Sequence, residues 1–353
     1  MRGRLWMASV VAVLLAGSAW AESPERLRLH TNEIELEATP ALGGRVLHFS
    51  AKGLPNLIKI GDAVRTQPSP EVSPEADDIG YLGHDVWLGP QSGWWSDQSV
   101  NPSRRAENAP WPPDPYLAFA TTTVEAHSPR QLVLEGVDSP VTGVRLRKTF
   151  ALDPKDPASV EVHVSARNIR DTPVSRDLWF NTRASAAMSV FVPAASAQEV
   201  RMDVGNDMAA PVWQVENGVF SLLPAPVTDE KPQRRGKVFV QPSAGWMAAF
   251  SEEQVFIIRF EHRAREDIHP EHGQIELYLD HGADIASGLL ELEVHAPFRT
   301  LAPGETMAAA ERWTALPYDG PADPASQLTF LCDVVAPRLG ETSLCPPAIP
   351  PLP

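Results

Sequence analysis

Apolar and polar residues alternate along most of this chain, which is the pattern of β-strands that bury one face. No stretch keeps a 3.6-residue period over four turns, and the best helix candidate is the short region 324–335. Because each strand has one apolar side to bury, strands at this density predict two large antiparallel sheets packed face to face. The clearest alternating runs are residues 33–37, 144–148, 160–164, 274–280 and 290–295.

The segment 71–115 does not alternate and is rich in Pro, Asp, Gly, Ser and Trp. Loops this long inside compact domains are usually functional or disordered. Disordered segments are poor in aromatic residues, whereas this one holds Trp87, Trp94, Trp95 and Trp111. We therefore expect an ordered segment that packs over another part of the molecule.

The first 21 residues have the features of a cleavable secretory signal peptide. Arg2 and Arg4 precede an apolar run at 8–16, and small residues follow at Ala19 and Ala21. The run is shorter than the roughly 20 residues that span a bilayer, although a retained anchor helix is the alternative. We predict a periplasmic or secreted protein with no integral membrane segment after cleavage.

The composition narrows the class of protein further. Proline supplies 35 of 353 residues, which favours short strands joined by loops. Without residues 1–21 the chain has 28 basic and 45 acidic residues, a net charge of −17. A surface this acidic repels polyphosphate, so we expect no nucleic-acid partner.

The two cysteines, Cys332 and Cys345, both lie near the C-terminus. In an oxidising compartment they are expected to form a disulfide, which for a loop of this size stabilises by about 3 kcal/mol in the chain-entropy model. We divide the chain into a signal peptide (1–21), one β-domain (22–318) and a Pro-rich tail with this disulfide (319–353).

Several short motifs, in order, resemble the galactose mutarotase-like proteins. They are GGRVLHF at 43–49, NIRDTP at 168–173, LWFN at 178–181, GLLELEVHAP at 288–297 and LAPGE at 301–305 with Trp313. With Gly89-Pro90-Gln91 and WPPDP at 111–115, the chain is most similar to the DUF4380 branch of this superfamily, over roughly residues 27–316. The resemblance implies one all-β, antiparallel β-supersandwich domain whose concave face binds sugars in the characterised relatives.

The resemblance also implies candidate catalytic residues. Mutarotation needs a base for the anomeric hydroxyl and an acid for the ring oxygen. In the relatives a Glu is the base, and Glu293 stands at that position. Alternation places Glu291, Glu293 and His295 on one strand face, which is either a wet concavity or a solvated outer surface.

The acid is where this chain departs from the relatives. Their central His is replaced by Leu178, which argues against classical aldose mutarotase activity. The best remaining candidate acid is His84, and the alternative is that His84 is a histidine of a surface loop.

Further residues are candidates for binding the substrate. Arg183 and Asn181 follow the central motif, and an Arg at this place either clamps a substrate or pairs with a structural Asp. The residues Trp87, Trp94 and Trp95 form either a platform for a pyranose ring or a lid that packs its own side chains. Glu291 and His295 complete the predicted substrate-binding set.

We expect no metal and no cofactor. His269, Glu271 and His272 have residue types that suit zinc, but we place them at a hairpin turn between 257–261 and 274–280, where this spacing does not bring the rings to one point. The chain has no G-x-S-x-G elbow, P-loop or dinucleotide fingerprint.

Two functions remain open from the sequence. The first is an exported carbohydrate-directed enzyme, a sugar epimerase or mutarotase with a remodelled site around Glu293. The second is a non-catalytic sugar- or glycan-binding protein on the same scaffold, since one fold hosts many functions.

Overall fold

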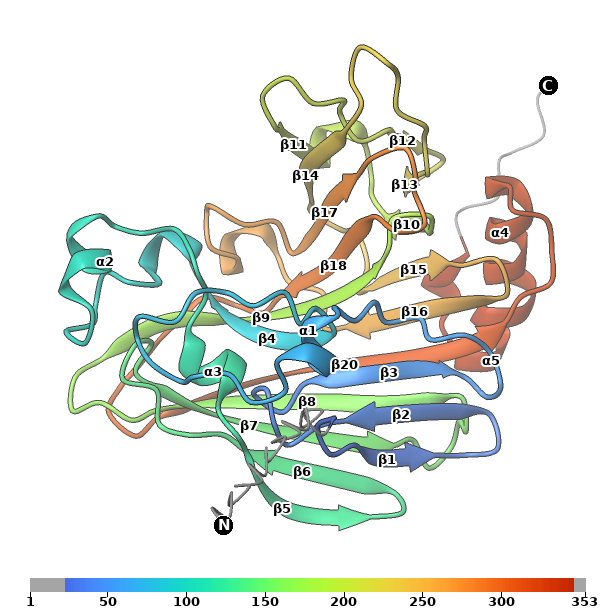
Figure 1. Ribbon diagram of the computed structural model, residues 1–353. Helices are drawn as coiled ribbons and strands as arrows, with labels where there is room; N and C mark the ends of the chain where they lie inside the picture. Colours follow the sequence, from blue (N-terminus) through green and yellow to red (C-terminus); the bar gives the residue numbers. More distant parts are fainter. Residues whose placement is uncertain (1–22, 346–353) are drawn as a thin grey trace, which may run out of the picture.

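Two ten-stranded antiparallel sheets packed face to face form the protein, as the alternating pattern predicts. The structure is a computed structural model that describes residues 23–345. Figure 1 shows the sheets as stacked layers, with the segment that contains α2 and the strands β11 and β14 projecting on one side. The predicted signal peptide at 1–21 lies outside the described residues.

The first sheet carries the candidate site. In spatial order its strands are β1 (Leu27–His30), β2 (Ile34–Ala38), β3 (Val46–Ala51), β4 (His84–Gly89), β9 (Val174–Ser185), β18 (Leu289–His295), β17 (Ile275–His281), β14 (Arg234–Val240) and β11 (Val200–Val204), and β19 (Arg299–Leu301) pairs with β9.

The second sheet covers the opposite side of the core. Its order is β12 (Trp213–Glu216), β13 (Val219–Leu222), β10 (Ser189–Pro193), β15 (Trp246–Phe250), β16 (Gln254–Phe260), β20 (Thr306–Pro317), β8 (Ser159–Asn168), β7 (Val144–Leu152), β6 (Gln131–Glu135) and β5 (Thr123–Ser128).

Helices are short and lie outside the sheets. They are α1 (Ala63–Thr66), α2 (Pro102–Ala106), α3 (Pro115–Phe119), α4 (Pro324–Phe330) and α5 (Ala336–Leu339), with single turns at Gln91–Gly93, Ala197–Glu199, Arg265–Asp267, Leu331–Val335 and Thr342–Leu344. No helix among the described residues is long and apolar enough to cross a membrane.

The core between the sheets is built from the apolar half of each alternating strand. On β18 the residues Leu290, Leu292 and Val294 join this core. From the second sheet, Trp313 packs against Phe49 of the first, with ring centroids 5.4 Å apart. Because alternate side chains point to opposite faces, the intervening residues of β18 must face away from the second sheet.

The segment 71–115 is ordered, but it contains one strand that the sequence pattern did not indicate. Strand β4 runs beside the central strand β9, with His84 opposite Thr182 and Gly89 opposite Asp177. Every residue of β4 is buried, so it lacks the polar half of the alternating signal.

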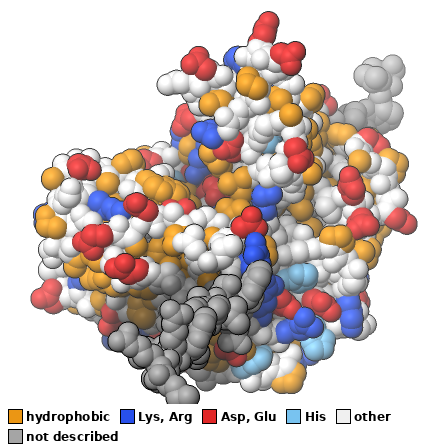
Figure 2. Space-filling view, viewed as in Figure 1, with side chains coloured by type: hydrophobic (Ala, Val, Ile, Leu, Met, Phe, Trp, Pro, Cys, Tyr) orange, Lys and Arg blue, Asp and Glu red, His pale blue; other side chains and the backbone are white. Residues whose placement is uncertain are grey.

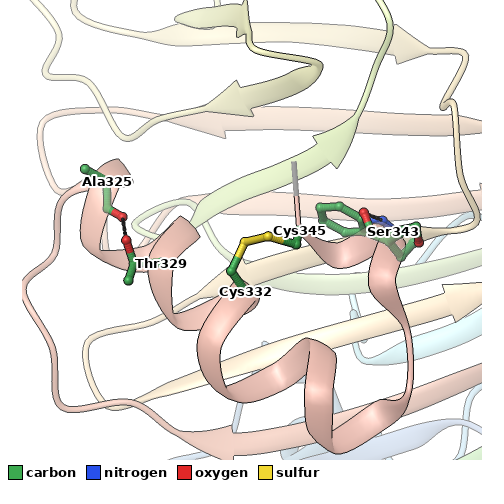
Figure 3. Close-up of a disulfide and its surroundings, with 6 residues drawn as sticks. Ala325, Thr329, Cys332, Ser343 and Cys345 are labelled. Carbon is green, nitrogen blue, oxygen red and sulfur yellow. Dashed lines mark hydrogen bonds between the residues drawn. A yellow bond between two sulfur atoms is a disulfide. The ribbon is translucent and has the colours of Figure 1, made fainter. Parts of the chain in front are cut away.

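The C-terminal residues pack against the β-domain. Leu331, Val335 and Leu344 belong to the main core, and Trp246 Nε1 donates a hydrogen bond to the Ser343 carbonyl at 3.1 Å. Figure 3 shows the disulfide between Cys332 and Cys345, which joins the middle of this helical segment to its C-terminal end. The predicted cysteine pair is therefore present, and the helix expected near 324–335 begins at Pro324.

The predicted hairpin turn around His269 is wrong. Strand β16, before the turn, belongs to the second sheet, whereas β17, after it, belongs to the first. The segment 261–274 is thus a crossover between sheets, and this position brings His272 close to the outer face of the first sheet.

Candidate functional site

Polar residues from neighbouring strands form rows across the outer face of the first sheet. One row runs through Asp85, Asn181, Glu293 and Glu276, which are successive register partners on β4, β9, β18 and β17. Side chains directly opposite in a sheet lie about 5 Å apart at their Cβ atoms.

A second row is displaced from the first by two residues along each strand. It runs through Arg183, Glu291, Tyr278 and Lys237 on β9, β18, β17 and β14. Strand pairing thus gathers seven ionisable side chains and one amide that lie far apart in the sequence.

A cavity of about 570 Å³ lies over these rows. Three indole rings line it, those of Trp87, Trp111 and Trp179, and we call it the tryptophan cavity. Trp111 comes from the long segment 71–115 and stays 47% exposed, so its ring is open to a ligand. In Figure 2 the surface is hollowed between the two projections that Figure 1 identifies as the α2 segment and the β11–β14 edge.

Glu293 lines the tryptophan cavity and is fully buried. Its Oε1 accepts a hydrogen bond from Asn181 Nδ2 at 2.9 Å, and its Oε2 lies 2.8 Å from Lys237 Nζ. Burial raises the pKa of Glu293 to about 7, since it outweighs the opposing charge of Lys237 and is helped by Glu291 and Glu276.

Lys237 bridges two carboxylates, because its Nζ also lies 2.5 Å from Glu276 Oε2. The same ammonium sits 4.6 Å from the centre of the Trp179 ring. Burial raises the pKa of Glu276, but Lys237 and His295 outweigh it and hold that pKa well below its ordinary value. Glu276 is therefore the ionised partner of Lys237.

On the other side of the tryptophan cavity, Arg183 pairs with two carboxylates. Its Nη1 contacts Asp85 and its Nε donates to Glu291 Oε1 at 2.9 Å. Arg45 Nη2 adds a second cation 2.8 Å from Asp85 Oδ2. Burial alone would raise the pKa of Asp85, but these two guanidiniums hold it below its usual range.

His295 does not line the tryptophan cavity but lies next to it, as the register partner of Trp179, with the centres of the two rings 4.7 Å apart. Its Nδ1 donates to Asp177 Oδ2 at 3.2 Å, and its Nε2 lies 3.5 Å from Glu276 Oε1. Burial lowers the pKa of His295, but Glu276 and Asp177 outweigh it and raise that pKa to about 9.

Two groups of residues have the types and spacing of metal ligands. Asp177, His272 and His295 offer atoms within 4.8 Å of one another, and so do His269, Glu271 and His272. In the first group Asp177 also accepts from the Gly89 amide at 2.7 Å, and His272 Nδ1 lies 2.9 Å from Glu276. Our expectation that the chain holds no metal stays a prediction.

His84 does not line the tryptophan cavity. It is the first residue of β4 and points into the core, where its Nδ1 lies 2.8 Å from Thr182 Oγ1. Its ring packs edge-on against Trp313 at 4.7 Å. Burial holds the pKa of His84 well below its ordinary value. The structure therefore separates His84 from Glu293 by the thickness of the first sheet.

The predicted tryptophan platform divides in the same way. Trp87 lines the tryptophan cavity, with Arg183 4.6 Å from the ring centre, and its edge packs against Trp179. Trp94 and Trp95 are buried and donate their indole N–H groups to the carbonyls of Leu88 and Pro112. These two rings hold the long segment in place, and neither lines the cavity.

Several site residues were not identified from the sequence. Glu276 and Tyr278 lie on the polar face of an alternating run that the sequence displays, so this pattern was a usable signal. Lys237 and Asp85 carry no such signal, because each reaches the site only through strand pairing.

The comparisons with known proteins identify the family. A family model described as "Domain of unknown function (DUF4380)" matches residues 24–316, so the chain belongs to this family. No curated protein matches the chain.

Two solved structures share the fold. The Slr1438 protein from Synechocystis sp. PCC 6803 is 13% identical, with a TM-score of 0.51, and the match covers 88% of this chain and all of that one (100%). A galactose mutarotase-like protein from Lactobacillus casei ATCC 334 is 10% identical, with a TM-score of 0.53, over 83% of this chain and 100% of that one. The architecture is thus that of the galactose mutarotase-like proteins.

Proposed function

We propose that this DUF4380 protein binds a carbohydrate in the tryptophan cavity. The observation that carries the proposal is the combination of indole rings with a floor of mutually paired charges. The apolar face of a sugar ring packs on an aromatic ring, while its hydroxyls exchange hydrogen bonds with polar groups at the edge. The volume of about 570 Å³ is in the range of small-molecule sites.

Charge pairing supports a neutral polyhydroxyl ligand. Arg183 and Lys237 each contact two carboxylates, so neither cation calls for an anionic ligand. The paired side chains of Arg183, Lys237 and Glu293 line the cavity, and sugar hydroxyls can both donate to and accept from groups of these types.

The protein acts outside the cytoplasm in this proposal. The N-terminal pattern of Arg2, Arg4 and the apolar run at 8–16 supports export. A disulfide between Cys332 and Cys345 is in keeping with an oxidising compartment.

A second candidate function, an epimerase-like isomerase, is favoured by one observation. The pKa of Glu293 rises to about 7 at the floor of the cavity, which suits a general base near neutral pH. The reaction also needs a proton donor on the other side of the sugar ring. No histidine among the described residues lines the cavity, so we rank binding first.

The first experiment is a glycan array probed with the protein that lacks residues 1–21, followed by calorimetric titration of any hit. We expect a neutral sugar among the ligands. If no sugar binds to the array, both candidate functions fail.

The second experiment separates binding from catalysis by NMR of anomeric exchange on the sugar that binds. We expect Glu293→Gln to abolish any exchange above the uncatalysed rate. The matched control is Glu311→Gln, since Glu311 is equally buried with a pKa raised to about 8 but lies on β20 of the other sheet. Exchange that survives Glu293→Gln removes Glu293 as the base.

A further inference from the structure

A second cavity, of about 520 Å³, lies where β9 begins beneath the segment that contains α2 (Figure 1). It shares no lining residue with the tryptophan cavity. Three arginines line it, Arg105, Arg170 and Arg176, and we call it the arginine cavity. The other lining residues are Asp97, Gln98, Ser99, Pro140, Thr172, Pro173 and Val174.

Arg176 is the buried centre of the arginine cavity, with only 3% of its surface exposed. Its Nη1 donates to the adjoining Ser175 carbonyl at 3.0 Å. Its Nε and Nη2 have no hydrogen-bond partner within residues 23–345. In the same part of the chain, Asp97, Asp114 and Asp177 act on this guanidinium through their charge alone, and none of them hydrogen-bonds to it.

The other two arginines are also without a carboxylate partner in the described part of the chain. Arg170 Nη2 donates to the Val141 carbonyl at 2.7 Å, and Arg105 Nη1 to the Gln98 carbonyl at 3.4 Å. Asp97 is the one acidic residue that lines the cavity, which leaves an excess of two positive charges. This excess stands out in a chain with a net charge of −15.

Leaving a guanidinium buried without a partner is costly, because burial removes its hydration and nothing replaces it. Burial lowers the pKa of Arg176, and it outweighs the charge of Asp97, the strongest of the surrounding charges, which raises that pKa. The Arg170 charge lowers the pKa further, and Asp114 and Asp177 oppose it more weakly. An anion in the cavity would bring beside Arg176 the anionic hydrogen-bonding group that this guanidinium lacks among the described residues.

We propose that the arginine cavity binds a tetrahedral oxyanion, phosphate or sulfate, either free or as an ester group on a larger molecule. The planar fork of a guanidinium matches two oxygens of such an anion, and charge-assisted hydrogen bonds of this kind are the strong ones. The proposal does not depend on carbohydrate binding, since the two cavities are lined by different residues.

The test is calorimetric titration of the protein, without residues 1–21, at constant ionic strength. Inorganic phosphate, inorganic sulfate, glycerol phosphate and acetate are titrated in turn. We expect saturable binding of phosphate or sulfate and none of acetate. Binding of inorganic phosphate supports a free ion, and binding of glycerol phosphate alone supports an ester. The proposal is overturned if phosphate, sulfate and glycerol phosphate all fail to bind saturably, or if acetate binds equally well.

Variants assign the binding to the cavity. Arg176→Met keeps much of the side-chain volume and removes both free donors, so the affinity should fall at least about tenfold. Arg170→Gln should weaken binding about threefold. This second variant tests the arginine cavity even if the Arg176→Met change, which is buried, impairs folding. The control is Arg147→Gln, because Arg147 is an exposed arginine paired with Glu125 on the second sheet. Unchanged affinity in both cavity variants, or an equal loss in the control, contradicts the assignment.

Discussion

The tryptophan cavity and the arginine cavity both contain buried cations, but they treat them in opposite ways. Lys237 and Arg183 each touch two carboxylates. Arg176 touches none within the described residues, and two of its nitrogens are free there. The difference arises from the strands. Register on the first sheet puts Glu291 opposite Arg183 and brings Glu276 and Glu293 within reach of Lys237. Arg176, by contrast, lies near the start of β9, where its register partner is Arg299.

This comparison separates two kinds of ligand. A network of paired charges presents fixed donors and acceptors with little net charge, which suits hydroxyl groups. A buried cation without a partner has a positive charge that nothing nearby compensates, and binding an anion would compensate it.

The largest effect is expected from Lys237→Met. The change leaves the buried carboxyls of Glu276 and Glu293 without their shared cation, which typically costs about 3–5 kcal/mol. Urea denaturation should show this loss in the free energy of unfolding. The control is Arg235→Met, since the ion pair of Arg235 with Asp280 is partly exposed. If the free energy of unfolding falls no more for Lys237→Met than for this control, the ion pairs of Lys237 with Glu276 and Glu293 do not stabilise the fold as proposed.

The second effect is a dependence of stability on pH through His295. Its pKa is raised from the ordinary 6.5 to about 9 in the folded protein, so the stabilisation is complete below pH 6.5 and is lost as the pH rises through 9. The pKa shift corresponds to at most about 3 kcal/mol.

We expect the difference in unfolding free energy between wild type and His295→Gln to shrink over this range, as measured by denaturation from pH 6 to 9. Arg176→Met should keep the dependence of the wild type. A difference that stays constant with pH would contradict the charged state of His295.

The third effect concerns ligand affinity. Trp111→Ala removes a half-exposed ring from the tryptophan cavity and should weaken binding of the sugar about tenfold in calorimetric titration. Trp213→Ala, on the second sheet, serves as the aromatic control and should leave the affinity unchanged. If the two variants behave alike, the ring of Trp111 does not contact the sugar.

The smallest effect is expected from Arg176→Met on stability. Replacing Arg176 leaves no buried carboxylate without its cation. The free energy of unfolding in buffer without phosphate or sulfate should therefore change by less than about 1 kcal/mol. The same denaturation assay as for Lys237→Met measures it. A loss similar to that of Lys237→Met would show that Arg176 has a partner and would remove the contrast between the cavities.

Part of the site could be predicted because it depends on local pattern. Alternation on β18 correctly places Glu291, Glu293 and His295 on the face opposite Leu292. The same pattern fails on β4, whose residues are all buried, so nothing in the sequence shows that His84 points inward.

By itself, the sequence determined the two-sheet architecture, the orderliness of the Trp-rich segment and the faces of the alternating strands. These follow from side-chain period and composition, which are properties of neighbouring residues. Only the tertiary structure decided which strands pair, and therefore that Lys237 meets Glu293, that His84 enters the core and that Arg176 is left alone. Strand register joins residues more than a hundred positions apart, such as Asn181 and Glu293, and its energy comes from packing that no local pattern records.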